Sequence, residues 1–201
     1  MYILYHFPYS QHARRVVSLL EAAGLPYELR HVDMAKGEHL SAAYLAINPN
    51  HQVPTLLDGD LTLHESNAIL RHLCHKHGLT DWYPVDPKQR AWVEQWLDWN
   101  QSRLSPAVID IVRNKVFLRE KGDKDAIARG EAKLRELGPI LEAGLAAQDF
   151  LTGPRPTIAD LSVASNLFQL GFAEAIPPGA HIAAWYQRMG VLDAFRKSLP
   201  R

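Results

Sequence analysis

A change of hydrophobic period near residue 80 constrains the fold of this 201-residue chain more than any other feature of its sequence. Before that point, short apolar runs alternate with segments in which apolar residues recur every three or four positions. These are the patterns of strands and helices respectively. After it, only the helical period continues, and the stretch between them, TDWYPVDPK, carries two prolines. We therefore expect two domains, residues 1–79 and 88–201, joined by a linker over residues 80–87.

The first domain is expected to be of mixed α/β type. Its opening run, YILYHF, is short and almost wholly apolar, which is typical of a buried strand. A helix that ends at Gly24 and a second strand, YELRHV, complete a βαβ unit. A short helix over residues 40–47, a hairpin that turns at residues 58–60 and a helix over residues 66–77 follow. This order predicts a thioredoxin-like fold.

The second domain is expected to be all-helical. Its first helix has two apolar faces, which predicts contacts both with its own domain and with a partner subunit. These faces carry Trp92, Trp96, Trp99 and Arg103, and Val93, Leu97 and Leu104, respectively. Pro106 is expected to kink or break this helix, because proline lacks a backbone N–H and clashes with the preceding turn. Thr157 and Asp160 stand at capping-box spacing before a segment that is apolar nearly all round, which predicts a central buried helix.

Composition excludes several classes of protein. Lys+Arg and Asp+Glu both total 22, so the formal net charge is zero, unlike that of most proteins that bind nucleic acids or anionic membranes. The single cysteine, Cys74, excludes an internal disulfide and favours a cytoplasmic location. No apolar run approaches the roughly 20 residues of a membrane-spanning helix. His72 and His75 lie three apart, but no further ligand converges on them, so no metal site is expected.

Three short stretches suggest chemistry. Ser10, in HFPYSQHARR, can cap a helix or present its hydroxyl to a ligand. Val53-Pro54 opens a strand, either as an ordinary edge or with a cis bond that turns the Val53 backbone outward toward a peptide-like ligand. Ser66 is expected to cap the next helix, whose free N–H groups can bind a carboxylate, while Glu65 can accept from an ammonium group. A carboxylate at the helix start and an ammonium group near Glu65 together describe the α-amino-acid end of a ligand.

These stretches belong to a wider resemblance. With SQ at 10–11, KGEHLS at 36–41, DWYP at 81–84 and FLTGPRPTIADLS at 150–162, the chain resembles the cytosolic glutathione transferase family, and most closely its theta-type, serine-using bacterial members. The resemblance implies a thioredoxin-like domain that holds glutathione as co-substrate and an all-α domain that covers a small hydrophobic electrophile. It also implies a cytoplasmic homodimer without a metal.

The resemblance assigns roles residue by residue. Ser10 would hydrogen-bond the glutathione sulfur and stabilise the thiolate, which is the nucleophile. The implied glutathione-binding residues are Gln11, His39, His51, Gln52, Val53, Pro54, Glu65 and Ser66, and the implied electrophile pocket contains Tyr9, Trp99, Asn100 and Arg103. Within this scheme His39 approaches the glycyl carboxylate, with His51 or Gln52 assisting. Val53 pairs with the cysteinyl backbone, and Glu65 and Ser66 hold the γ-glutamyl end.

One departure and three alternatives follow. His12-Ala13 stands where members of this branch often have proline or cysteine, and we expect His12 to face solvent instead of adding positive charge near the sulfur. The same fold and co-substrate also serve dehalogenation and peroxide reduction, and some members of such families are non-catalytic stress or scaffold proteins. The presence of Ser10, Glu65 and Ser66 favours an enzyme.

Overall fold

The computed structural model describes residues 1–200 and divides into two compact units. One unit comprises Met1–Leu79 and the segment that begins at Leu192, and the other comprises Thr80–Val191. The return of the last segment to the first unit differs from the expected span of residues 88–201. Its cause is the short helix α9 (Asp193–Lys197), which packs on α1 (Gln11–Ala22). No helix in the described part of the chain is long and apolar enough to cross a membrane.

Arg14 explains why α9 packs there. Its guanidinium lies 3.9 Å from the centre of the Phe195 ring, donates to the Phe195 carbonyl at 3.1 Å and reaches the Ser198 hydroxyl at 3.1 Å. Arg14 and Phe195 are both buried, so each loses its contacts with water on folding. The contact between the guanidinium and the ring takes the place of that water. The sequence pattern placed Arg14 off the apolar face of its helix, and therefore did not predict this contact.

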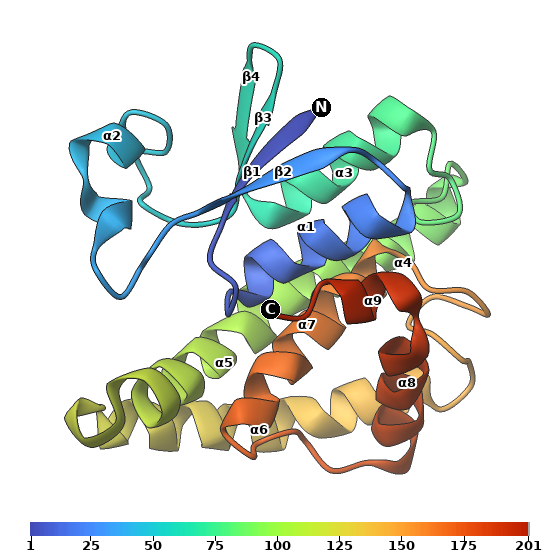
Figure 1. The fold of residues 1–201 in the computed structure, drawn as a ribbon. Coiled ribbons are helices and arrows are strands. Elements are labelled where there is room, and N and C mark those ends of the chain that lie inside the picture. Colours follow the sequence, from blue (N-terminus) through green and yellow to red (C-terminus); the bar gives the residue numbers. More distant parts are fainter. Residues whose placement is uncertain (201) are drawn as a thin grey trace. The chain divides into compact units, whose positions relative to one another are not determined.

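A four-stranded mixed sheet forms the centre of the first unit (Figure 1). Its strands, in spatial order, are β2 (Tyr27–His31), β1 (Tyr2–His6), β3 (Thr55–Asp58) and β4 (Leu61–His64). The β1–β2 pair is parallel and the other two pairs are antiparallel. Leu4 and Leu56, which face each other across β1 and β3, are fully buried where α1 and α3 (Ser66–His77) cover the sheet. This arrangement confirms the expected thioredoxin-like unit.

The register of the sheet gathers three chain segments at one end. Tyr5 faces Thr55 across β1 and β3, and Thr55 in turn faces His64 across β3 and β4. At this row β1 is about to end, β3 begins and β4 ends. The turn before α1, the loop before β3 and the start of α3 therefore leave the sheet from the same end.

The second unit consists of helices. They are α4 (Pro87–Trp99), η2 (Asn100–Leu104), α5 (Ser105–Val112), η3 (Arg113–Leu118), η4 (Arg119–Lys121), α6 (Lys124–Leu145), α7 (Ile158–Phe172) and α8 (Ala180–Val191). Of the kink or break expected at Pro106, a break is not found, since α4, η2 and α5 follow one another without a gap, but the winding of the helix changes directly before the proline. The η2 segment is π-helical, and its wider turn includes Ser102, whose carbonyl the proline ring would meet in a regular α-helix.

Asp160 ties three segments of this unit together. It is fully buried, and its two carboxylate oxygens accept hydrogen bonds from the amides of Leu151 and Thr157, the Thr157 hydroxyl and the Trp185 indole N–H, at 2.8–3.1 Å. The predicted capping box of Thr157 and Asp160 is confirmed. The sequence did not indicate that the same carboxylate also holds Leu151 and Trp185.

Replacement of Asp160 by alanine should therefore destabilise the protein. Asp160→Ala leaves several buried donors without an acceptor, and we expect the free energy of unfolding to fall by about 3–5 kcal/mol. Urea denaturation followed by circular dichroism measures it. Asp149→Ala, at an exposed aspartate 3.9 Å from Arg188, is the control and should cost less than about 1 kcal/mol. Equal losses in the two variants would contradict a structural role for the Asp160 network.

Candidate active site

Ser10 begins helix α1. Its backbone is extended, with φ −78° and ψ 117°, and its Oγ accepts a hydrogen bond from the Ala13 amide at 3.2 Å. This confirms the predicted cap. A hydroxyl that accepts still has its own proton to donate, so Ser10 can hold the helix start and serve a second partner at the same time. The first turn of α1 carries no acidic residue, so the positive end of the helix dipole is not neutralised there.

His12 is partly buried, and the expectation that it faces solvent is wrong. Burial, helped by the charge of Arg15, lowers the pKa of His12 to about 3. The ring is therefore neutral near pH 7 and contributes no positive charge to the start of α1. Its Nε2 lies 3.3 Å from the amide nitrogen of Gln11, which is itself 2% exposed. Gln11 is thus a buried neighbour of Ser10, and no partner of its Oε1 is found within residues 1–200.

The loop before β3 is held by two buried side chains. The Asn48 amide donates to the Gln52 carbonyl at 2.9 Å and to the Thr55 hydroxyl at 3.0 Å. The Tyr44 hydroxyl donates to the same carbonyl at 2.6 Å and lies 3.1 Å from the Thr55 hydroxyl. Asn48 is 1% exposed and Tyr44 is 5% exposed, so water does not compete for these hydrogen bonds. The loop is therefore fixed at both ends of the Val53-Pro54 pair.

The Val53-Pro54 peptide bond is cis, so this part of the second interpretation of the proline is confirmed. The Val53 side chain is buried against Val32 and Tyr44. In the part of the chain that the structure describes, neither the backbone N–H nor the carbonyl of Val53 makes a hydrogen bond. An unpaired main-chain donor and acceptor beside the first residue of β3 are suited to an extended peptide-like ligand.

Glu65, and not Ser66, occupies the cap position of α3. The prediction of Ser66 as the cap is wrong: Ser66 is the first helical residue and is 4% exposed. Glu65 has φ 69° and ψ 105°, and its side chain makes no capping hydrogen bond. Such a backbone conformation is strained in a residue with a Cβ. The first N–H groups of α3 are consequently not capped by Glu65, and an exposed carboxylate stands beside them.

The remaining predicted residues, His39, His51 and Gln52, lie close to one another. Gly37, with φ 77°, precedes the single turn η1 (Glu38–Leu40) that carries His39. The His39 and His51 rings lie 6.3 Å apart, centre to centre. The Nδ1 atom of His39 is buried and has no hydrogen-bond partner among residues 1–200. The exposed Gln52 side chain lies 3.5 Å from Nδ1 of His51, so these three residues form a cluster able to receive a carboxylate.

The four predicted electrophile-pocket residues are divided between the two units. Tyr9 is 44% exposed in the first unit, whereas the other three belong to the helical unit. Trp99 packs edge-on against Trp96, with ring centres 5.1 Å apart, and Arg103 is exposed. Asn100 is fully buried.

Both polar atoms of the Asn100 side-chain amide make hydrogen bonds inside the helical core. Its nitrogen donates to the Ser162 hydroxyl at 3.0 Å, and its oxygen accepts from Asn166 at 2.7 Å. Asn100 is therefore a core residue, and its predicted place in the pocket is wrong. The sequence does not show which buried partners a polar residue will meet, so it did not predict this core position.

Sequence reasoning missed a buried arginine beside the site. Arg15 on α1 is fully buried, and its Nη1 lies 3.3 Å from Oδ1 of Asn67, the second residue of α3. Burial lowers the pKa of Arg15 to about 9, which leaves it charged near pH 7. The contact links α1 to the first turn of α3, the two helices that follow the cap residues Ser10 and Glu65. Periodicity placed Arg15 off the apolar face of α1, and no other signal in the sequence marked it.

The described residues contain no cluster of three or more His, Cys, Asp or Glu side chains able to hold a metal ion. His72, considered above as a ligand, lies 2.8 Å from Asp58, which also binds Lys76. This histidine therefore belongs to a surface ion-pair cluster between α3 and the hairpin.

Comparisons with known proteins agree with the fold. The family described as "Glutathione S-transferase, N-terminal domain" matches residues 4–81, and "Glutathione S-transferase, C-terminal domain" matches residues 124–188. The human glutathione S-transferase theta-1 is 37% identical over 188 residues, which cover 90% of this chain and 78% of that protein. Glutathione S-transferase 2 of Anopheles gambiae is 34% identical over 190 residues, 92% of this chain and 88% of that protein.

A solved structure extends the similarity to the whole chain. The theta class glutathione S-transferase of Xanthomonas axonopodis pv. citri, determined with glutathione bound, is 32% identical. The alignment has a TM-score of 0.90 and covers 100% of this chain and 97% of the other.

The strain at Glu65 leads to a stability prediction. Glu65→Gly places a residue without a Cβ at φ 69° and should remove about 1–3 kcal/mol of strain, against about 0.5–1 kcal/mol of additional chain entropy lost on folding. Glu65→Ala is the matched control, because it removes the carboxylate but keeps the Cβ. We expect urea denaturation to show Glu65→Gly about 1 kcal/mol more stable than Glu65→Ala. A glycine variant that is no more stable than the alanine variant would show that the conformation is not strained.

The neutral state of His12 predicts a pH effect. In the unfolded chain the ring takes up a proton below its ordinary pKa of 6.5, whereas in the folded protein it does so only near 3. The stability conferred by His12 is therefore complete above pH 6.5 and is lost as the pH falls toward 3. Between pH 7 and pH 5 the wild type should lose about 1–2 kcal/mol more than His12→Gln, the lower figure allowing for the partial exposure of the ring.

Urea denaturation at the two pH values measures this difference. His75→Gln, which removes an exposed imidazole of α3, is the control. If His12→Gln and the wild type lose stability in parallel, His12 is not held neutral by the fold.

Proposed function

The chain belongs to the glutathione S-transferase family, and from this membership we propose that Ser10 activates the thiol of bound glutathione for attack on a small hydrophobic electrophile. The relatives named as glutathione S-transferases and the structure with glutathione bound support this enzyme and its co-substrate. The observation that carries the site is the sheet register, which brings the turn of Ser10, the cis Val53-Pro54 loop and the start of α3 to one end of the first unit.

The open groups at that end match glutathione from one terminus to the other. In our proposal the γ-glutamyl carboxylate lies on the first N–H groups of α3 at Ser66, and its ammonium group lies against Glu65. The cysteinyl residue pairs with the unpaired backbone of Val53, which Pro54 holds outward. The glycyl carboxylate reaches His39, assisted by His51 or Gln52. Gln11 acts from within the protein, as a buried neighbour of Ser10.

The chemistry that this arrangement supports is thiol activation. A free thiol has a pKa near about 8.5 and is mostly protonated at pH 7, whereas the thiolate is the nucleophile. The Ser10 hydroxyl donates its hydrogen bond to the sulfur, and the start of α1 favours the negative charge. The thiol proton leaves to solvent. The sulfur electron pair then forms a bond to the electron-poor carbon of the electrophile, which releases its leaving group or accepts the charge by addition.

Three further parts of the proposal concern the whole molecule. We propose that Tyr9, Trp99 and Arg103 contribute to the electrophile pocket. We also propose a homodimer, supported by Trp92, whose ring is 47% exposed on α4. The single buried Cys74, which cannot join an internal disulfide, supports a cytoplasmic location.

Ser10 variants test the mechanism. Ser10→Ala removes the hydroxyl and should raise the pKa of the bound thiol by about one unit. Turnover at pH 6.5 should therefore fall by up to about tenfold. The affinity for glutathione should change little, because its other contacts remain. Ser10→Thr keeps a hydroxyl and should retain most of the thiolate. The thiolate absorbance near 240 nm, titrated with pH, and the turnover of a generic aryl halide measure these quantities.

The possible outcomes separate the alternatives. If Ser10→Ala leaves both thiol pKa and turnover unchanged, Ser10 does not stabilise the thiolate. If the wild type binds glutathione and forms the thiolate but turns over only alkyl halides or peroxides, the fold serves one of those reactions. If the wild type does not bind glutathione at all, the proposed site is wrong.

A further inference from the structure

Arg15 is a positive charge held inside the protein, near the place where α1 and α3 begin. It is fully buried on α1, and its Nη1 lies 3.3 Å from Oδ1 of Asn67. Asn67 is the second residue of α3 and is itself 8% exposed. Because an asparagine side chain is uncharged, this contact accepts a guanidinium N–H without neutralising the charge. Burial of a charge is costly in free energy, so its presence here calls for a reason beyond packing.

Helix geometry directs the guanidinium of Arg15 back toward Ser10. The two residues are five positions apart on one helix, which corresponds to about 7.5 Å along its axis. Side chains on a helix lean toward its N-terminus, so the stem of Arg15 carries the charge in that direction. The contact with Asn67 agrees, because α3 starts at the same end of the sheet as the turn of Ser10. The charge therefore lies near the first turns of both helices.

A titratable ring beside Ser10 already responds to this charge. The pKa of His12 is lowered mainly by burial and further by the charge of Arg15. His12 is the second residue of α1, so the effect reaches the first turn of the helix. The same positive charge lowers the free energy of an anion placed near that turn.

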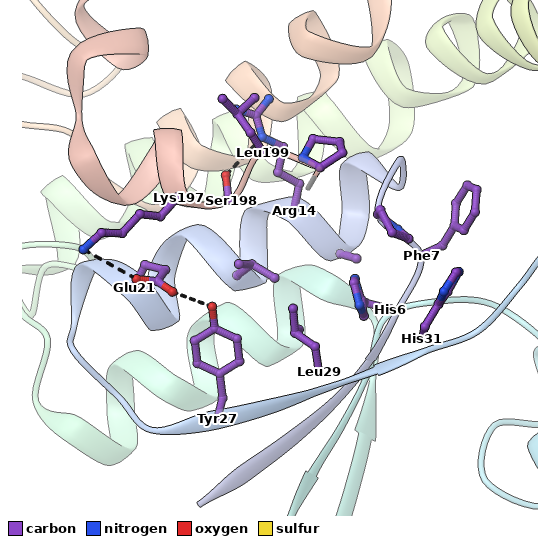
Figure 2. Close-up of a pocket in the computed structure, with 14 residues that line it drawn as sticks. His6, Phe7, Arg14, Glu21, Tyr27, Leu29, His31, Lys197, Ser198 and Leu199 are labelled. Carbon is purple, nitrogen blue, oxygen red and sulfur yellow. Dashed lines mark hydrogen bonds and ion pairs between the residues drawn. The ribbon is translucent and has the colours of Figure 1, made fainter.

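The other charged side chains near the ends of α1 are engaged elsewhere. Arg14 reaches the Ser198 hydroxyl of the segment after α9 at 3.1 Å (Figure 2). Glu21, in the last turn of α1, accepts a hydrogen bond from Tyr27 and lies 3.9 Å from the Lys197 ammonium group (Figure 2). The first turn of α1 contains no acidic residue. No acid of this turn therefore opposes the effect of the buried cation.

The charged side chains of α3 also lie away from its start. Within the helix they begin only at Arg71, and the first turn contains no acidic residue. His72 and Lys76, further along, bind Asp58 of the hairpin. The exposed carboxylate of Glu65, directly before the helix, is proposed above to face the ammonium group of glutathione. The buried cation thus stands behind the first turns of two helices that lack acidic residues of their own.

We propose that Arg15 is a positioning residue for the reaction, whose charge stabilises the thiolate of bound glutathione without touching the ligand. This inference rests on the proposed function, because it concerns the same thiol. Arg15 neither accepts nor releases a proton in this role: the thiol proton leaves to solvent, and the fixed charge shifts the equilibrium toward the thiolate. Ser10 supplies the hydrogen bond to the sulfur, and Arg15 supplies a field that burial protects from screening by salt.

Two reciprocal variants separate the charge of Arg15 from its contact. Arg15→Gln removes the charge but keeps a polar side chain that can donate to Asn67, whereas Asn67→Ala removes the contact but keeps the charge. The thiolate absorbance is titrated with pH in complexes saturated with glutathione, so that a change in affinity does not enter. We expect the thiol pKa to rise by about 0.5–1 unit in Arg15→Gln and to stay within about 0.2 unit of the wild type in Asn67→Ala.

The pH profile of turnover is a readout that a merely structural role would not give. Near pH 6.5, Arg15→Gln should turn over an aryl halide about three- to tenfold more slowly than the wild type. The difference should vanish near about pH 9, where the thiol is ionised in both proteins. The shift in thiol pKa should also persist at about 0.5 M salt, because a buried charge is little screened. If Arg15→Gln does not fold, Arg15→Met removes the charge with an apolar side chain and gives the same readouts.

Three results would overturn the inference. They are an unchanged thiol pKa in Arg15→Gln, an equal rise of the thiol pKa in Arg15→Gln and Asn67→Ala, and turnover reduced by one factor at both pH values. A wild-type complex without a thiolate would instead contradict the proposed function, and this inference with it. A thiolate that responds to Ser10→Ala but not to Arg15→Gln would contradict only the role of Arg15.

Discussion

The row of facing residues Tyr5, Thr55 and His64 is the constraint on which the candidate active site depends. Side chains alternate along a strand, so a shift of one residue in this register would exchange the two faces of β3. It would also move the cis Val53-Pro54 pair along the end of β1, away from the turn that leads to Ser10. Fully buried Leu56, directly after Thr55, fixes the register because it has to face the core. The candidate site is thus positioned by the burial of apolar side chains in the core of the first unit.

Around this frame, satisfied and unsatisfied polar groups are separated. The Asn48 and Tyr44 side chains are buried and donate their hydrogen bonds to the loop that carries the cis bond. The Val53 backbone, the start of α3 and Nδ1 of His39 are left open, and Glu65 is held in a conformation that its Cβ disfavours. Proteins tolerate such costs only where surrounding contacts determine the conformation. The open groups therefore mark the region where we propose that glutathione binds.

The sequence predicted the parts of this arrangement that depend on local chemistry. The Ser10 cap, the Thr157–Asp160 capping box and the two kinds of fold follow from short-range patterns, and they are present. The parts that depend on tertiary neighbours were not predictable. Asn100 is polar by type, yet buried hydrogen-bond partners place it in the core. Pro106 breaks a regular helix, but a π-helical turn before it provides the room that the rule does not consider. In each case a distant segment or a change of backbone winding decided the outcome.

The electrostatics of α1 show how much of the thiol activation its own residues can supply. A hydrogen bond to a charged acceptor contributes about 1.5–3 kcal/mol and a helix end about 0.3–1 kcal/mol, which together correspond to about one to three units of thiol pKa at about 1.4 kcal/mol each. His12 adds nothing, because its ring is neutral. The charge of Arg15, however, is felt at His12, whose pKa it lowers. A field that disfavours a proton on that imidazole favours an anion placed beside the same turn. The charge of buried Arg15 would therefore also favour the thiolate that we propose at Ser10, from inside the protein, where solvent ions do not screen it.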